Sequence, residues 1–204
     1  MNRLKSIKSA LTIFLFFSLV LVGMYFFSKG NSNNVPNEEE VPDSVKFSKE
    51  YPGVGENNVF EYKTIEEIIK IFESGTGVVY LGFPECPWCQ RYVIYLNEVA
   101  NDVGLKNIYY FNILQDRKDN TEGYRTLLSL LDGYLLNDDD GNPRIFVPDI
   151  SVVVNGEIVG HDNETSMESG SVDEYWTEQK VENFKNKLKG ILEKVVNNCK
   201  TCNI

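Results

Sequence analysis

Four cysteines form two pairs with two residues between the members, Cys86 with Cys89 and Cys199 with Cys202. Two thiols at this spacing lie within reach of each other on a helix, so a pair can close to a disulfide or bind a metal ion. Zinc ribbons separate their two pairs by about 15–20 residues, whereas 109 residues lie between Cys89 and Cys199. The only histidine is His161. We therefore expect redox chemistry at the first pair, and no metal site.

The first pair lies where a strand is expected to end and a helix to begin. Residues 78–83 are apolar throughout, which is typical of a strand buried on both faces. Pro87 favours the first position of a helix, where free backbone N–H groups and the helix dipole stabilise a thiolate. Cys86 is therefore the expected attacking thiol, and Cys89, on the apolar face of the helix, the expected resolving thiol. Such a pair needs no cofactor, although a purely structural disulfide has the same spacing.

The remaining patterns predict an alternation of helices and strands. Apolar residues that recur every three or four positions predict helices near 64–74, 89–104, 121–135 and 181–197. Thr64 and Glu67 have the spacing of a capping box at the first of these helices. Runs rich in aromatic and branched residues predict strands at 109–114, 150–154 and 158–159, and the polar residues 137–144 predict a loop. Asn155-Gly156 suits a type I′ hairpin turn. We expect one α/β domain at residues 58–197.

The amino-terminal segment has the composition of a membrane anchor. Twenty uncharged residues separate Lys8 from Lys29, and about 20 residues span a bilayer as a helix. Three basic residues precede the segment and three consecutive glutamates follow it, which predicts a cytoplasmic amino terminus and an external remainder. We expect an uncleaved signal-anchor at residues 1–29, with residues 10–28 in the lipid bilayer. Cleavage after the poor signal-peptidase site at residues 28–30 is the alternative.

The remaining features are the segment before the predicted domain, the net charge of the chain and the tail after the domain. Residues 30–57 are rich in Asn, Pro, Gly, Ser and Glu, which predicts a flexible linker. A net charge of −10 without a basic stripe argues against nucleic acid as a partner. The tail at residues 198–204 holds the pair Cys199 and Cys202. Three interpretations of this second pair stay open: a disulfide at the helix end, two free thiols, or a redox relay to the first pair.

Residues 83–90, Phe-Pro-Glu-Cys-Pro-Trp-Cys-Gln, follow the predicted strand and open the predicted helix. Together with Val147-Pro148 and the Asn-Gly hairpin, they resemble the thioredoxin superfamily, and in detail the extracytoplasmic thioredoxin-like and bacteriocin-accessory proteins of Gram-positive bacteria. The resemblance implies a thioredoxin-like fold, with a central mixed sheet flanked by helices and a cis-proline loop at Val147-Pro148 that faces the cysteines. It also implies substrate binding by Pro87, Trp88, Val147 and Pro148, although Trp88 is equally suited to surface packing.

The resemblance implies a membrane-anchored reductase or isomerase of disulfides that acts on protein thiols and disulfides outside the membrane, with an unidentified redox partner. A disulfide-forming oxidase and a non-catalytic binding module are the alternatives. One position departs from the pattern: thioredoxins commonly have a buried acid six residues before the first cysteine, and this chain has Tyr80 there. Proton transfer is therefore expected to use water or another group. His161 is interpreted as a solvated surface histidine, with a role as a base for the cysteines as the alternative.

Overall fold

The computed structural model describes residues 41–199, except for the side chain of Cys199. The predicted anchor at 1–29, the first part of the predicted linker and Cys202 lie outside the described residues. Within residues 41–199, no helix is both long enough and apolar enough to cross a bilayer.

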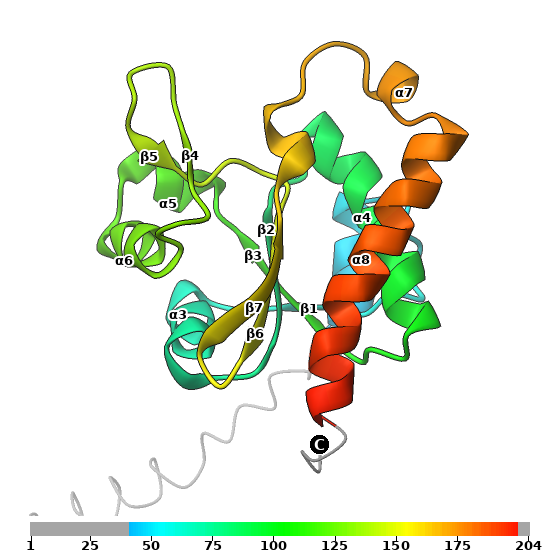
Figure 1. Cartoon of the computed structure of the whole chain (residues 1–204), viewed down its shortest axis with the longest axis horizontal. Helices are drawn as coiled ribbons and strands as arrows, with labels where there is room; N and C mark the ends of the chain where they lie inside the picture. The colour runs from blue at the N-terminus through cyan, green and yellow to red at the C-terminus, as the bar shows by residue number, and fades with distance from the viewer. Residues whose placement is uncertain (1–40, 200–204) are drawn as a thin grey trace, which may run out of the picture. The chain divides into compact units, whose positions relative to one another are not determined.

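A five-stranded sheet in the order β1-β3-β2-β6-β7 lies between two layers of helices (Figure 1). Strands β1 (Phe60–Tyr62), β3 (Ile108–Asn112) and β2 (Gly77–Gly82) are parallel, and β6 (Asp149–Val154) and β7 (Glu157–Asp162) continue the sheet in antiparallel pairing. The prediction of an α/β domain with a mixed central sheet is therefore confirmed.

Helices cover both faces of this sheet. One layer contains α3 (Ile65–Ser74), α5 (Leu114–Asp119) and α6 (Glu122–Leu130), and the other contains α4 (Pro87–Asp102) and α8 (Glu178–Cys199) (Figure 1). The central strand β2 is covered on both sides, and each residue from Val78 to Leu81 has no exposed surface. Burial on both faces explains why this strand is apolar without alternation.

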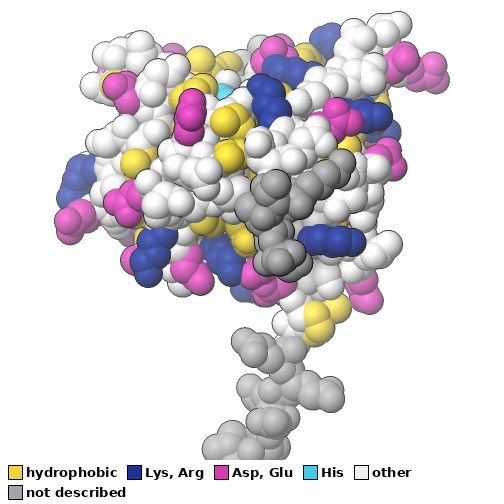
Figure 2. Space-filling view, turned by 60° about the horizontal axis from the view of Figure 1, so that its bottom comes forward, with side chains coloured by type: hydrophobic (Ala, Val, Ile, Leu, Met, Phe, Trp, Pro, Cys, Tyr) yellow, Lys and Arg dark blue, Asp and Glu magenta, His cyan; other side chains and the backbone are white. Residues whose placement is uncertain are grey.

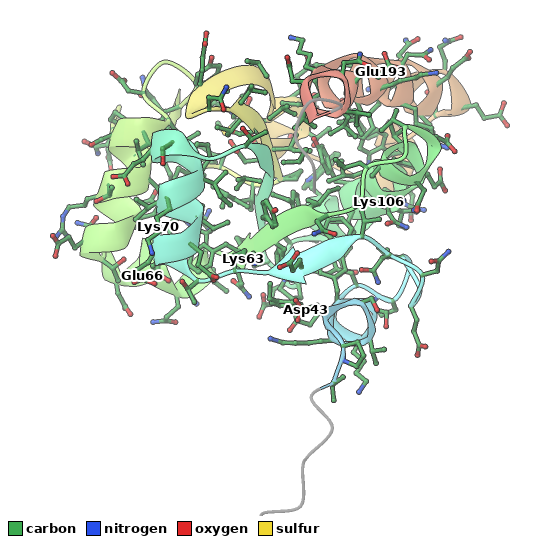
Figure 3. The ribbon with its side chains drawn as sticks, turned by 90° about the horizontal axis from the view of Figure 1, so that it is seen from below. Asp43, Lys63, Glu66, Lys70, Lys106 and Glu193 are labelled. Atoms are coloured by element: carbon green, nitrogen blue, oxygen red, sulfur yellow. The ribbon has the colours of Figure 1, made fainter. Side chains whose placement is uncertain are left out.

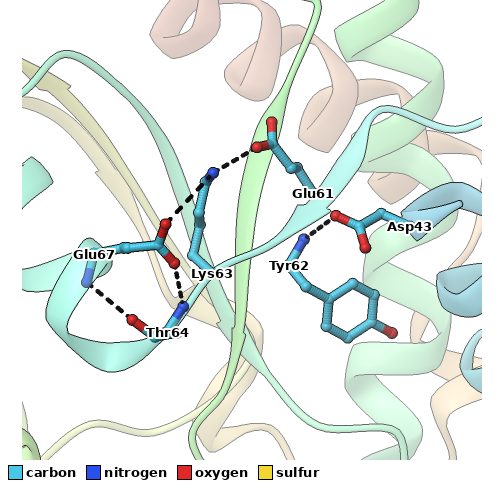
Figure 4. Close-up of polar contacts among 6 residues, drawn as sticks. All are labelled: Asp43, Glu61, Tyr62, Lys63, Thr64 and Glu67. Atoms are coloured by element: carbon cyan, nitrogen blue, oxygen red, sulfur yellow. Dashed lines mark hydrogen bonds and ion pairs between the residues drawn. The ribbon is translucent and has the colours of Figure 1, made fainter. Parts of the chain in front are cut away.

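The start of α3 follows the predicted capping box. Thr64 is the N-cap, its hydroxyl accepts the Glu67 backbone N–H at 3.3 Å, and the Glu67 carboxylate accepts the Thr64 N–H at 2.8 Å (Figure 4). These two bonds satisfy backbone N–H groups that have no partner within the helix at its N-terminal end. Lys63 forms ion pairs with Glu61 at 2.5 Å and with Glu67 at 3.9 Å, so the helix entry is also joined to β1.

The β6–β7 hairpin turns at Asn155-Gly156, as predicted. Both residues have positive φ angles, 51° and 81°, which the type I′ turn requires. A Cβ atom at Gly156 would lie 2.5 Å from the Glu73 carbonyl oxygen, so the hairpin tip packs closely against the end of α3. Glycine at this position therefore serves the turn and the packing together.

The prediction of a flexible linker at residues 30–57 is wrong from residue 43 onward. A helix, α2 (Asp43–Glu50), packs beside β1, with Asp43 at its start (Figure 3). Phe47 is fully buried and stacks on Phe60 with 3.9 Å between ring centroids, and the Asp43 carboxylate accepts the Tyr62 N–H at 2.9 Å. Polar residues dominate α2, so its sequence lacks a sustained apolar period. Its place in the domain comes from aromatic contacts with residues distant in the chain.

The remaining differences are local. The predicted helix at 121–135 is shorter, and α5 precedes it, because Asn120 has a left-handed conformation (φ 47°) that ends α5. The predicted loop at 137–144 contains a small hairpin of β4 (Leu136–Asn137) and β5 (Pro143–Arg144). Two short helical segments, η1 (Glu164–Met167) and α7 (Val172–Tyr175), connect β7 to α8.

Figure 2 shows a face of the molecule on which basic and acidic side chains are intermixed with small apolar areas.

Candidate active site

Cys86 lies between β2 and α4, the position that the sequence predicts. It is the N-cap of α4, and Pro87 is the first helical residue. Proline suits this position because the first N–H groups of a helix have no partner within the helix and the fixed φ of proline matches the helix. Cys86 thus follows the buried strand β2 and precedes the first helical turn, whose backbone N–H groups have no partner within the helix.

The two thiols differ sharply in their surroundings. The Cys89 backbone N–H donates a hydrogen bond to the Cys86 Sγ at 3.1 Å. Cys86 is 8% exposed, whereas Cys89 has no exposed surface and lies on the inner face of α4. The two cysteines are free thiols in this structure. A reagent in solution can therefore reach Cys86 but not Cys89.

The pKa values of the two thiols move in opposite directions. A hydrogen bond from the Cys89 side chain lowers the pKa of Cys86 most, and backbone N–H groups of Cys89 and Trp88 and the charge of Arg117 lower it further. Burial raises the pKa of Cys89 well above its ordinary value, and the hydrogen bond and charge of Cys86 add to this. Cys86 is thus the thiol that forms a thiolate first.

The loop at Val147-Pro148 faces the cysteines. The Cys86 Sγ lies 3.9 Å from the Val147 carbonyl oxygen, and the Val147-Pro148 peptide bond is cis, which confirms that expectation. Val147 is nearly buried, with 7% of its surface exposed, and Pro87 is exposed. The structure therefore brings together the segments at 86–89 and 147–148 that the sequence separates by more than fifty residues.

Trp88 packs against a helix that the sequence analysis did not predict. Its ring meets the Tyr175 ring of α7 edge to face, with centroids 5.1 Å apart, and the side chain is half-buried. This contact favours the packing interpretation for the buried part of Trp88.

Tyr80 occupies the position of the missing acid. Its side chain is fully buried on the α4 side of the sheet, where its ring stacks on Tyr92 with centroids 6.0 Å apart. The Tyr80 hydroxyl has no hydrogen bond of regular geometry among the described residues, and the group that it faces is the Cys89 thiol, whose pKa it lowers. A Cβ atom at Gly82 would lie 2.6 Å from this hydroxyl, so glycine leaves the space that the hydroxyl fills.

A network of one hydrogen bond and two ion pairs extends from Tyr92 through the buried Asp162 to α8. The Tyr92 hydroxyl donates to Asp162 at 2.8 Å, and Lys187 of α8 pairs with Asp162 at 2.5 Å and with Glu164 at 2.7 Å. The Asp162 side chain has no exposed surface, so the lysine supplies the countercharge that its burial requires. No sequence pattern locates this network, because its members come from α4, β7, η1 and α8.

His161 is not a solvated surface residue, and that interpretation is wrong. Its side chain is only 9% exposed, with Nδ1 3.0 Å from the Ser151 hydroxyl and Nε2 3.4 Å from the Asp149 carboxylate. Burial lowers the pKa of His161 to about 4, and burial also raises the pKa of Asp149 well above its ordinary value. Both ring nitrogens thus face β6 residues, and the role as a base for the cysteines has no support from these contacts.

Arg117 is the site residue that the sequence analysis missed. It comes from the short helix α5, its guanidinium lies 5.0 Å above the Phe83 ring, and it donates to the Ile145 carbonyl at 3.4 Å. It therefore connects the loop before Cys86 with the loop before Pro148. An isolated arginine in an unpredicted helix gives no sequence signal for such a role.

The second cysteine pair stays a prediction. Cys199 is the last residue of α8, and Cys202 lies outside the described residues. Among residues 41–199, no group of three or more His, Cys, Asp or Glu side chains is arranged to hold a metal ion.

Comparisons of this chain with models of protein families, with curated proteins and with solved structures found no match. The function of this chain is therefore inferred from the geometry of the site.

Proposed function

We propose that this chain is a thiol-disulfide oxidoreductase with a thioredoxin-like fold, in which Cys86 attacks substrates and Cys89 resolves the intermediate. The observation that carries the proposal is the asymmetry of the pair: a slightly exposed N-cap thiol with a lowered pKa lies next to a buried thiol with a raised pKa. A structural disulfide does not require this difference. Neither metal nor organic cofactor enters the chemistry.

The reaction proceeds in two exchanges. The Cys86 thiolate attacks one sulfur of a substrate disulfide, a mixed disulfide forms, and the other substrate sulfur leaves as a thiolate that takes up a proton. Cys89 then loses its proton and attacks the Cys86 Sγ, which releases the second substrate thiol and closes the Cys86–Cys89 disulfide. Two electrons pass from the protein to the substrate. A separate reductant, the unidentified redox partner, must restore the dithiol.

Reduction or isomerisation is the proposed direction of this exchange. A strongly oxidising pair needs a greatly stabilised thiolate, and Glu85 places a negative charge next to Cys86 in the sequence. We expect a reduction potential nearer about −270 mV than about −120 mV. Titration of residues 35–204, which retain α2, against glutathione buffers tests this. A midpoint above about −150 mV would leave disulfide formation, the alternative function.

The second alternative is a binding module that uses the same scaffold without turnover. Reduction of insulin and repair of scrambled ribonuclease separate the two, because a binding module lacks both activities. Loss of either activity in Cys86→Ser, with retention in the double variant Cys199→Ser/Cys202→Ser, would assign the turnover to the first pair. Equal activity in Cys86→Ser and the unmodified chain would contradict the proposal.

The proposed location is the outer face of a cell membrane, with residues 10–28 in the bilayer and the amino terminus in the cytoplasm. Its support is the uncharged segment and the positive charges before it. The mature protein should retain Met1, and protease added to cells with a permeabilised wall should digest the catalytic domain. Protection of that domain would overturn this orientation.

A further inference from the structure

A cavity of about 530 Å³ lies next to the proposed active site, on the side of α5 and the β4–β5 hairpin. Arg117 lines the cavity and also belongs to the edge of the site, where it lies above Phe83 and bonds to the Ile145 carbonyl. The charge of Arg117 acts on the Cys86 thiol. The cavity and the reactive sulfur thus share one residue. A volume in this range is typical of sites for small groups and short peptide segments.

The cavity is positively charged in an otherwise acidic protein. Arg117, Lys118 and Arg144 line it, with Asp138 as the acidic lining residue, whereas the whole chain has a net charge of −10. One Asp138 carboxylate oxygen already accepts the N–H groups of Asp140 and Asn142, at 3.1 and 2.9 Å. The acid is therefore engaged in the turn of its own hairpin.

The three cations have no acidic partners of their own. Within residues 41–199, none of Arg117, Lys118 and Arg144 forms an ion pair. The Arg144 Nε is buried and has no hydrogen-bond partner among the described residues. Arg117 and Arg144 line the same cavity, and burial and the positive charge of Arg144 lower the pKa of Arg117. Two neighbouring guanidinium groups without a carboxylate are destabilised, and a bound anion removes that cost.

We propose that this cavity binds a carboxylate of the disulfide substrate while Cys86 attacks the neighbouring sulfur. The inference deepens the proposed function, because it names the substrate class: disulfides with a carboxylate a few bonds from the reacting sulfur. Guanidinium groups suit a carboxylate because their N–H donors match its two oxygens in a bidentate pair. Two sources supply this chemistry, an acidic side chain next to the cysteine of a peptide and the carboxylates of a small thiol such as glutathione.

A matched pair of substrates tests the proposal on the full-length chain. One is a disulfide peptide with glutamate on either side of its cysteine, and the other has glutamine there. We expect kcat/KM for the acidic peptide to exceed that for the neutral peptide by about tenfold at low salt, and the preference to shrink as salt rises. Arg144→Gln and Lys118→Gln should lower kcat/KM for the acidic peptide more than kcat/KM for the neutral peptide, so the preference shrinks.

Lys106→Gln is the control for loss of one positive charge. Lys106 is exposed and precedes β3, so it lies at the opposite end of the parallel strands from Cys86, which follows β2 (Figure 3). This variant should keep the full preference. Glutathione disulfide compared with its carboxylate esters distinguishes the small thiol from the peptide as the source of the carboxylate.

The outcomes separate this inference from the proposed function. Turnover of both peptides at equal kcat/KM, or equal loss for both in Arg144→Gln, would overturn the carboxylate site and leave the oxidoreductase. If neither peptide is turned over, the proposed function fails, and calorimetry with serine in place of the peptide cysteine still tests the site. Salt-sensitive binding of the acidic serine peptide that Arg144→Gln weakens about tenfold supports the site, and absence of that binding refutes it.

Discussion

The Cys86 Sγ accepts the backbone N–H of Cys89 at 3.1 Å, so the Cys89 backbone stabilises the Cys86 thiolate. This bond belongs to the start of α4 and forms whenever the helix forms, because the N-cap side chain accepts from a residue in the first turn. Hydrogen bonds at the start of α4, from the Cys89 side chain and from backbone N–H groups, therefore lower the pKa of Cys86.

The first prediction concerns the roles of the two thiols. Cys89→Ser should accumulate mixed disulfides through Cys86, since the second exchange then lacks its nucleophile. Cys86→Ser should trap none, because Cys89 is fully buried. Non-reducing gels and mass spectrometry of the trapped partners measure both. Attachment of partners in equal amounts through Cys199 or Cys202 would contradict the assignment.

A second prediction concerns pH. The pKa of Cys86 is lowered in the folded state, so its thiolate persists to lower pH than that of an ordinary cysteine. In reduced protein, alkylation of Cys86 by iodoacetamide should rise with pH and reach half its maximum below the ordinary pKa of about 8.5. The unfolded chain in urea provides the reference. If the folded and unfolded profiles coincide, the N-cap does not stabilise the thiolate.

A third prediction concerns Tyr80. Burial raises the pKa of its hydroxyl well above the ordinary value, so the group keeps its proton and can donate a hydrogen bond when Cys89 becomes a thiolate. Tyr80→Phe should slow release of substrate from the mixed disulfide by about tenfold and move the pH profile of that step upward. Formation of the mixed disulfide should change little.

Tyr62→Phe is the matched control for this experiment. Its hydroxyl is also buried without a hydrogen bond of regular geometry among the described residues, but it faces Glu50 and not the thiols. Rapid-quench measurement of the two exchanges separates the variants. An unchanged second exchange in Tyr80→Phe, or an equal change in Tyr62→Phe, would refute the role of Tyr80.

The fourth prediction concerns α2, the helix within the predicted linker. Phe47 is fully buried and stacks on Phe60 and Tyr51, with centroids 3.9 and 4.4 Å apart. Phe47→Ala should lower the free energy of unfolding by about 3–5 kcal/mol, because it removes a buried ring and leaves a cavity. Lys49→Ala, on the exposed side of α2, should change it by less than about 0.5 kcal/mol. Urea denaturation measures both, and equal small effects would mean that α2 does not stabilise the domain.

Several features of the site and the fold are encoded in short stretches of chain. Cys86 and Cys89 lie at a strand end and a helix start, Thr64 and Glu67 cap α3, and Asn155-Gly156 turns the hairpin. Each depends on residues only one to three positions apart, so helix geometry, proline and positive φ angles suffice to predict them.

The residues that surround the cysteines from distant parts of the chain come together through tertiary packing. Arg117 reaches the cysteine loop from α5, and Asp162 pairs with Lys187 of α8 because β7 and that helix pack together. His161 contacts Ser151 and Asp149 because its strand pairs with β6, and α2 is held by aromatic residues of β1 and β3. These contacts follow from strand order and helix packing, for which a single sequence contains no local signal. Side chains from separate elements meet only after the chain has folded.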